Sequence, residues 1–359
     1  MQIIAINICA GFTAVWLFDI IINMYKRILI KAPNWLGDAV MALPTIKGMR
    51  TLFPESHLAV LVKSELADLF RHDPDINEVI GYESRRGLKS LSSEYKLIKE
   101  VKSKRFDLAL ILPRSFHSAL IGFLSKIPNR IGYSADSRGK LLTQSLPRTK
   151  AGLAQHRVYY FLNLLNIIGR PVSFSAPRIT ISKATRDWVT DKLAYVKGHA
   201  VVGLNPGATY GSAKCWPAER YARLARDLIN NKKAWVIIFG SPAEEKLNSI
   251  IAAQIKHHQV LDFTGQTSIT QMAGLLSACK LLVTNDTGTM HVAAAVNTPV
   301  VAIFGPTDHV TTPPFGNNHS IVRKEVSCSP CLKRTCPTDH RCMTRISVED
   351  VYKECEKYL

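Results

Sequence analysis

Residues 24–44 read MYKRILIKAPNWLGDAVMALP. The run from Ile28 to Lys31 is short and β-rich, which is typical of a strand that the chain enters directly. Gly37 and Asp38 then follow at the point where this strand ends and a helix-length stretch begins. We therefore expect a strand, a turn and a helix, the repeating unit of doubly wound sheets.

The same alternation of β-rich runs and amphipathic stretches continues along the chain. It indicates parallel sheets whose strands are joined by crossover helices. A helix expected over residues 151–170, followed by Pro171 and a polar stretch to Pro177, separates two sets of strands. The sequence predicts two doubly wound α/β domains with a cleft between them, and a closing helix over residues 347–358 with Ser347 and Asp350 near its start. The expected strands are residues 28–31, 57–62, 78–82, 108–112, 130–133, 200–205, 234–239, 260–263, 280–284 and 299–304.

Length and charge limit the function. A chain of 359 residues with 47% hydrophobic content fits two domains of roughly 150 residues each. The net charge of +18 predicts an anionic partner, and the excess leans N-terminal: residues 1–175 carry 24 basic and 13 acidic residues (+11), the remainder 22 and 15 (+7). Because no basic stripe interleaved with aromatic residues is present, nucleic acid is disfavoured.

The first 23 residues stand apart from this pattern. Ile3 to Ile22 is almost wholly apolar, interrupted mainly by Asn7 and Asp19. The stretch lacks the basic region and the cleavage site of a signal peptide. Two interpretations stay open: translation begins at Met24, or the segment is a membrane anchor.

Three segments after expected strands carry candidate chemistry. Asp38 can act as a general base or merely cap a helix. The loop NPGATYGSAKCWP at residues 205–217 offers small residues and a cation, Lys214, for a phosphate, although it does not match the P-loop spacing. The segment TNDTGTMH at residues 284–291 leads into a helix whose free N–H groups suit a diphosphate. Within it, Asp286 can bind sugar hydroxyls or cap the helix, and His291 can be a ligand contact or a buried structural residue.

A cysteine-rich stretch near the C-terminus raises the alternative of a zinc site. Cys328, Cys331, Cys336 and Cys342 lie within fifteen residues, with His340 alongside. Structural zinc sites usually show two paired knuckles, and here the second pair is too widely spaced. We favour a local structural role over zinc.

Together the motifs NWLGDAVMALP (34–44), NPGATYGSAKCWP (205–217), FGSPAEE (239–245) and TNDTGTMHVAAA (284–295) resemble glycosyltransferase family 9, the ADP-heptose:lipopolysaccharide heptosyltransferases, and most closely those of the heptosyltransferase II type. The resemblance runs from Met24 nearly to the C-terminus. It implies a GT-B fold of two doubly wound, Rossmann-like domains facing a cleft: an acceptor-binding domain at 24–172, a donor-binding domain at 173–343 and the closing helix at 344–359. The apolar extension at 1–23 has no counterpart in the family pattern.

The resemblance also implies residue roles. Asp38 matches the catalytic base, and Lys214 stabilises the departing ADP. Glu244 matches the carboxylate that holds the adenosine ribose, although Glu245 is adjacent. The full set of implied donor contacts is Thr209, Lys214, Glu244, Asp286, Thr287, Gly288, Thr289, Met290 and His291. The acceptor contacts that we expect are Asn34, Trp35, Arg114 and Arg138.

The implied reaction is a metal-independent, inverting displacement that moves heptose from ADP-heptose to the lipid A-linked inner core. No metal or cofactor is expected, since the Asp-x-Asp sequence Asp73-Pro74-Asp75 lies in a turn-like stretch away from these loops. We expect the enzyme in the cytoplasm, peripheral on the inner face of the membrane, held by a cationic face of Arg85, Arg86, Arg114, Lys126, Arg130, Arg138 and Lys140. The alternatives are another family 9 core transferase such as the heptosyltransferase I type, a UDP-sugar 2-epimerase, or a non-enzymatic protein that docks on anionic lipid.

Overall fold

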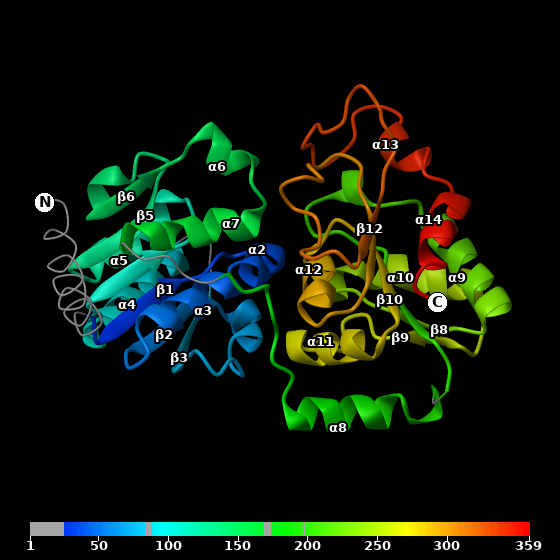
Figure 1. Cartoon of the computed structure of the whole chain (residues 1–359), viewed down its shortest axis with the longest axis horizontal. Helices are drawn as coiled ribbons and strands as arrows, with labels where there is room; N and C mark the ends of the chain where they lie inside the picture. The colour runs from blue at the N-terminus through cyan, green and yellow to red at the C-terminus, as the bar shows by residue number, and fades with distance from the viewer. Residues whose placement is uncertain (1–24, 84–87, 169–173, 197) are drawn as a thin grey trace, which may run out of the picture. The chain divides into compact units, whose positions relative to one another are not determined.

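A computed structural model describes residues 25–83, 88–168, 174–196 and 198–359. The extension at residues 1–23, Arg85, Arg86 and the predicted boundary between residues 172 and 173 lie outside the described residues. The chain forms two compact units (Figure 1). The first contains the chain up to Asn34, Ala42–Gly152 and Val158–Ser175. The second contains Trp35–Met41, Leu153–Arg157 and Ala176–Leu359.

The first unit is built on a six-stranded parallel sheet in the order β3-β2-β1-β4-β5-β6. Buried apolar residues of the inner strands form its core, because both faces of such a sheet are covered. Its strands are β1 (Arg27–Lys31), β2 (His57–Lys63), β3 (Glu78–Tyr82), β4 (Leu108–Ile111), β5 (Asn129–Ser134) and β6 (Gln144–Pro147). Its helices are α3 (Leu43–Leu52), η1 (Ser64–Leu69), α4 (Leu88–Ser103), α5 (Phe116–Leu124), η2 (Gly139–Leu141), α7 (Arg157–Leu162) and η3 (Asn163–Ile168), with most of α6 (Lys150–Ala154).

The second unit repeats this plan with the strand order β12-β11-β10-β7-β8-β9, again all parallel. Its strands are β7 (Val201–Asn205), β8 (Trp235–Ile238), β9 (Val260–Asp262), β10 (Leu281–Asn285), β11 (Val300–Ile303) and β12 (His319–Val322). Its helices are α2 (Leu36–Met41), α8 (Lys183–Lys192), η4 (Ala194–Val196), η5 (Ser212–Lys214), α9 (Ala218–Lys232), η6 (Pro242–Glu244), α10 (Glu245–Ile255), α11 (Ile269–Ala278), α12 (Gly288–Ala295), α13 (Arg341–Thr344) and α14 (Val348–Cys355).

The predicted α/β class of two parallel, helix-flanked sheets is confirmed. The closing helix is α14, and its first turn is fixed by a capping box: the Ser347 N–H donates to the Asp350 carboxylate at 2.8 Å, and the Asp350 N–H donates to the Ser347 hydroxyl at 3.1 Å. Among the helices that the structure describes, none is both long and apolar enough to cross a membrane.

The single helix predicted over residues 151–170 is wrong. The chain instead forms α6, α7 and η3, with a break at Gln155 and His156. At the break the Arg157 N–H donates to the carbonyl of Thr311 at 2.9 Å, and a ring nitrogen of His156 lies 3.0 Å from the carbonyl of Pro313. Tertiary hydrogen bonds therefore replace the helical ones that the sequence pattern indicated.

Candidate functional site

The strand order of the second unit brings two of the predicted segments together. β7 and β10 are neighbours at the point where the order of strands reverses. The loop at residues 206–217 leaves the carboxyl end of β7, and Asp286 and Thr287 leave that of β10. Crevices at such a reversal are where open α/β sheets bind ligands.

Lys214 joins these two segments. Its ammonium lies 2.6 Å from a carboxylate oxygen of Asp286 and donates to the Asp286 carbonyl at 3.0 Å. Both side chains are largely buried, with 13% and 8% of their surfaces exposed. The ammonium also lies 5.0 Å from the ring centre of Tyr210. The predicted phosphate cation is thus already paired with a carboxylate, so the pair has no net charge.

Asn285, the last residue of β10, anchors the same loop through its side-chain amide. Its amide nitrogen donates to the carbonyls of Pro206 (2.6 Å) and Gly207 (3.3 Å). Its amide oxygen accepts the N–H of Trp216 (3.0 Å) and the hydroxyl of Tyr221 (3.1 Å). All four bonds converge on one fully buried amide, which fixes the loop against the sheet. Sequence reasoning did not single out Asn285, although a polar residue at the end of an apolar run is a usable signal.

Helix α12 begins at Gly288, two residues after Asp286, as predicted. Thr287 is its N-cap residue but makes no side-chain cap, which leaves the first-turn N–H groups to an external acceptor. Thr287 and Gly288 are partly exposed, whereas Thr289 is buried and Met290 fully buried. The start of α12 can therefore bind an anion at Thr287 and Gly288, while Met290 lies in the core.

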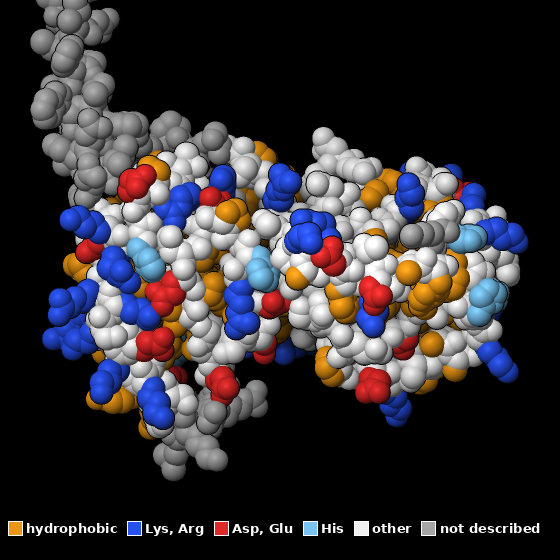
Figure 2. Space-filling view, turned by 90° about the horizontal axis from the view of Figure 1, so that it is seen from below, with side chains coloured by type: hydrophobic (Ala, Val, Ile, Leu, Met, Phe, Trp, Pro, Cys, Tyr) orange, Lys and Arg blue, Asp and Glu red, His pale blue; other side chains and the backbone are white. Residues whose placement is uncertain are grey.

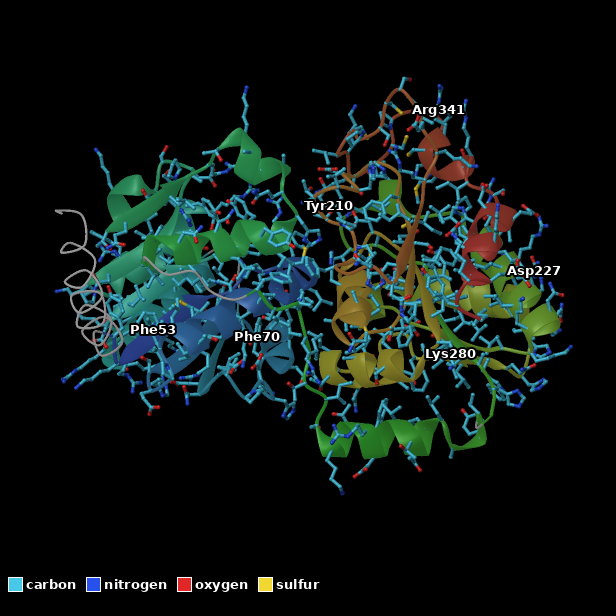
Figure 3. The ribbon with its side chains drawn as sticks, viewed as in Figure 1. Phe53, Phe70, Tyr210, Asp227, Lys280 and Arg341 are labelled. Carbon is cyan, nitrogen blue, oxygen red and sulfur yellow. The ribbon has the colours of Figure 1, made fainter. Side chains whose placement is uncertain are left out.

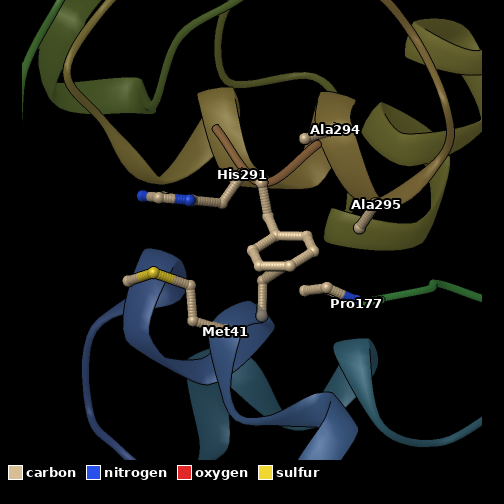
Figure 4. A pocket seen from close by; sticks show the side chains of 7 residues that line it. Met41, Pro177, His291, Ala294 and Ala295 are labelled. Carbon is tan, nitrogen blue, oxygen red and sulfur yellow. The ribbon is translucent and has the colours of Figure 1, made fainter. Parts of the chain in front are cut away.

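Helix α2 packs on this end of α12 through two glycines. A Cβ at Gly37 would lie 2.7 Å from Cδ2 of His291, and a Cβ at Gly288 would lie 2.8 Å from Cβ of Leu36. Only hydrogen fits at either position, so the two helices meet at close range. Figure 4 shows His291 of α12 beside Met41 of α2, with Ala294, Ala295 and Pro177 lining the same small apolar crevice.

His291 is 95% buried there, and burial lowers the pKa of its imidazole to about 4; the neighbouring charges of His156, Lys214 and His319 act in the same direction, while Asp286 opposes them. The ring is consequently neutral near pH 7. Among the described residues, its Nδ1 has no hydrogen-bond partner. A buried orphan nitrogen costs free energy unless a ligand or water satisfies it, which favours the ligand interpretation of His291.

Asp38 lies in the first turn of α2, partly exposed. Its helix belongs to the same unit as Lys214, Asp286 and α12. The structure thus places the predicted base and the predicted anion-binding segments in one packed body.

Glu244 faces the β7 loop from η6. Its carboxylate accepts the N–H (2.7 Å) and hydroxyl (2.8 Å) of Ser241, and a Cβ at Gly207 would lie 1.8 Å from its other oxygen. Gly207 is therefore required for this close approach. Glu245 begins α10 and is exposed. Thr209 is exposed in the same loop as Gly207.

In the first unit, Asn34 closes a small polar cluster. Its side-chain oxygen accepts from the ammonium of Lys31 (3.1 Å) and from the hydroxyl of Tyr82 (2.9 Å). Burial, aided by the charge of Lys63, lowers the pKa of Lys31 to about 7. Sequence reasoning missed Lys31, because a lysine that ends an apolar strand looks like ordinary surface.

The predicted acceptor residues differ in exposure. Trp35 is 51% exposed and Arg114 is exposed. Arg138 is fully buried: its guanidinium donates to the carbonyls of Tyr133 (2.8 Å), Ser115 (3.4 Å) and Pro113, and burial lowers its pKa to about 10. Arg138 therefore adds nothing to a cationic face and instead holds the backbone on both sides of Arg114.

Of the cysteine-rich stretch, Cys328, Cys331 and Cys336 lie between β12 and α13 and Cys342 lies in α13; all four thiols are free. Burial and the neighbouring Cys328, Cys336 and Cys331 raise the pKa of Cys342 to about 11. Among the described residues, no group of three or more His, Cys, Asp or Glu side chains is arranged to hold a metal ion.

In the Asp-x-Asp turn, the Asp73 carboxylate accepts the Asp75 N–H at 2.9 Å, a turn-forming bond.

The second unit thus offers a lysine and helix N–H groups to an anion, and a carboxylate, Asp38, that can accept a hydroxyl proton. The profile of glycosyltransferase family 9 (heptosyltransferase) matches residues 94–341. The chain belongs to glycosyltransferase family 9. It is 32% identical over 307 residues to lipopolysaccharide heptosyltransferase 2 of Escherichia coli K12, covering 83% of this chain and 88% of that protein. The structure of E. coli ADP-heptose lps heptosyltransferase II aligns with a TM-score of 0.79 at 28% identity, over 92% of this chain and 98% of that one.

A relative of another type within the family is more distant. Lipopolysaccharide heptosyltransferase 1 of Pseudomonas aeruginosa is 25% identical, over 93% of this chain and 98% of its own length. The chain is therefore a glycosyltransferase whose similarity favours the heptosyltransferase II type over type I.

Proposed function

We propose that this family 9 enzyme transfers heptose from ADP-heptose to the heptose- and Kdo-containing inner core carried on lipid A. The observation that carries the proposal is the meeting of two donor segments at the strand reversal of the second unit, where Lys214 spans from the β7 loop to Asp286. The identity to heptosyltransferase 2 proteins, higher than to a type 1 protein, supports the choice of acceptor.

In this proposal the second unit binds ADP-heptose. Glu244 receives the adenosine ribose beside Gly207, and Thr209 and Lys214 bind the diphosphate with the start of α12. Asp286 and the orphan Nδ1 of His291 receive heptose hydroxyls. Thr289 and Met290, buried in α12, support the helix start from within.

The reaction is a single displacement. Asp38 takes the proton from the acceptor hydroxyl, the acceptor oxygen forms a bond to the anomeric carbon, and the bond from that carbon to the β-phosphate oxygen of ADP breaks. Attack from the face opposite the leaving group inverts the anomeric configuration. The ammonium of Lys214 and the N–H groups of α12 stabilise the negative charge that develops on ADP. These groups supply the stabilisation without a metal.

The first unit supplies acceptor contacts through Asn34 and Arg114, and Trp35, the next residue in the chain after Asn34, supplies another. Arg138 acts here as a positioning residue for the loop of Arg114. We place the enzyme in the cytoplasm, peripheral on the membrane that carries the acceptor. On the face of the first unit visible in Figure 2, Lys and Arg side chains are numerous but interspersed with Asp and Glu, so the electrostatic attraction should be moderate and screened by salt.

The test is product analysis. Purified full chain is incubated with ADP-heptose and either of two defined acceptors, inner core bearing Kdo alone or Kdo with one heptose, and the products are weighed by mass spectrometry. A gain of one heptose on the second acceptor, lost in Asp38→Asn, is the expected result. Transfer only to the Kdo acceptor would indicate a type I enzyme, and transfer to neither would refute the proposal. An epimerase would instead convert a UDP-sugar without any acceptor.

A further inference from the structure

The cysteine loop, residues 327–340 between β12 and α13, is docked on the β7 loop that carries Lys214. The N–H of Ala213 donates to the carbonyl of Arg334 at 3.0 Å, and the Tyr210 hydroxyl donates to the carbonyl of Leu332 at 2.8 Å. A ring nitrogen of His340 lies 2.7 Å from the carbonyl of Ala213. In Figure 3, Tyr210 and Arg341, just beyond the cysteine loop, are labelled on the second unit.

Gly211 makes this docking close. Its φ of +155° and its position leave no room for a side chain, because a Cβ would lie 2.3 Å from the carbonyl oxygen of Arg334. The glycine that the sequence places in the β7 loop is thus explained by the backbone of the cysteine loop, 123 residues further along.

The docking brings a second cation to the aromatic ring that Lys214 also contacts. The Arg334 guanidinium lies 5.2 Å from the ring centre of Tyr210, and the Lys214 ammonium lies 5.0 Å from that same centre. Arg334 is exposed and Lys214 is not, so a ligand arriving from solvent reaches Arg334 freely.

Charge balance favours a second cation at the diphosphate. Asp286 neutralises Lys214 at 2.6 Å, whereas the diphosphate of a nucleotide sugar carries two negative charges. An arginine presents paired N–H donors that match phosphate oxygens. We propose that Arg334 binds the donor diphosphate beside Lys214, and that the cysteine loop serves to hold Arg334 there; this inference rests on the proposed nucleotide-sugar donor.

The test compares nucleotide affinities of full-length variants by titration calorimetry. Arg334→Met removes the charge but keeps the backbone carbonyl that bonds Ala213, so the loop should stay docked and the thermal midpoint unchanged. We expect ADP to bind about 5- to 20-fold more weakly while adenosine, which has no phosphate, binds equally well. Arg334→Lys should recover part of the loss. Lys333→Met, an exposed neighbour with the same change in charge, is the matched control and should bind ADP within twofold of the parent.

The outcomes separate the two hypotheses. If the parent binds ADP and Arg334→Met binds it equally well, the Arg334 assignment is wrong and the proposed donor stands. Equal losses for ADP and adenosine would show a structural role and also overturn the assignment. A parent chain that binds no ADP would overturn the proposed donor itself, and the assignment with it.

Discussion

Lys214 should have two separable roles, one in stability and one in donor binding. Lys214→Met keeps the aliphatic stem but removes both hydrogen bonds to Asp286. The Asp286 carboxylate, 8% exposed, then loses its cation. Removing one partner of a buried pair typically costs about 3–5 kcal/mol. Because Lys214 keeps 13% of its surface exposed, we take the low end, about 3 kcal/mol.

A loss of this size is measurable. For a unit of this size each kcal/mol lowers the thermal midpoint by about 2–4 °C, so Lys214→Met should unfold roughly 6–12 °C earlier than the parent. The double variant Lys214→Met/Asp286→Asn removes the orphaned charge while keeping its shape. It should regain most of the midpoint, since replacing both partners avoids a buried unpaired ion.

The double variant should regain thermal stability without regaining affinity for the donor nucleotide. Without the ammonium, ADP affinity should fall about 10- to 150-fold in the single variant, from the loss of a charge-assisted bond worth about 1.5–3 kcal/mol. The double variant should bind ADP no more tightly than about a tenth of the parent affinity, although it is stable. Calorimetry and thermal scans on the same four proteins, including Asp286→Asn alone, complete the cycle. A single variant with parental midpoint and ADP affinity would refute the reasoning.

Asp38→Asn keeps the shape of the side chain but removes the base, so turnover should fall about 10²- to 10⁴-fold with ADP affinity nearly unchanged; turnover within a few fold of the parent would contradict the general-base role. Gly37→Ala places a methyl group 2.7 Å from His291, so turnover should fall and unfolding free energy should drop by about 1–3 kcal/mol in urea titrations, whereas parental values would mean that the helices separate easily. Because the folded pKa of His291 is lowered to about 4, the unfolded chain but not the folded one takes up this proton between about pH 6.5 and 4. The free energy of unfolding should therefore fall as the pH falls through this window, by up to about 1.4 kcal/mol per pH unit. His291→Gln should flatten that slope in urea titrations at pH 7, 6 and 5. A chain beginning at Met24 should co-sediment with anionic vesicles at low ionic strength and release as salt rises; salt-resistant binding that needs residues 3–22 would indicate a hydrophobic anchor instead.

Strands could be predicted where both of their faces are buried. β7 and β10 are fully buried runs, and the sequence places each within about one residue of its observed ends. β6 and β12 were missed because each lies at a sheet edge, partly exposed, and carries no continuous apolar run. The break at His156 was missed for another reason: its cause is a pair of hydrogen bonds to residues more than 150 positions away.

The candidate site divides in the same way. Local motifs predicted which segments end strands and begin helices, so Asp38, Lys214 and the start of α12 could be named from the sequence. The contacts between segments that lie far apart in the chain could not be predicted from the sequence. The Lys214–Asp286 ion pair joins residues 72 positions apart, and Arg334 reaches Tyr210 through a loop that sequence spacing linked only to cysteine chemistry. Arg138 was predicted to lie on the surface because it is a basic residue in a loop-like stretch. In the structure it is fully buried and donates hydrogen bonds to backbone carbonyls.

The position of Asp38 has a consequence for the proposed displacement. Proton removal and departure of ADP must occur in one geometry, and catalytic groups typically need to be held within about 0.5 Å of it. The division between units falls directly after Asn34, so Asp38 belongs with Lys214 and α12 although the strand before it belongs to the other unit. Gly37 and Gly288 fix this arrangement, because each lets the other helix approach to a distance that any side chain would prevent. The spacing between the base and the groups that stabilise the leaving diphosphate is therefore set by packing within a single unit.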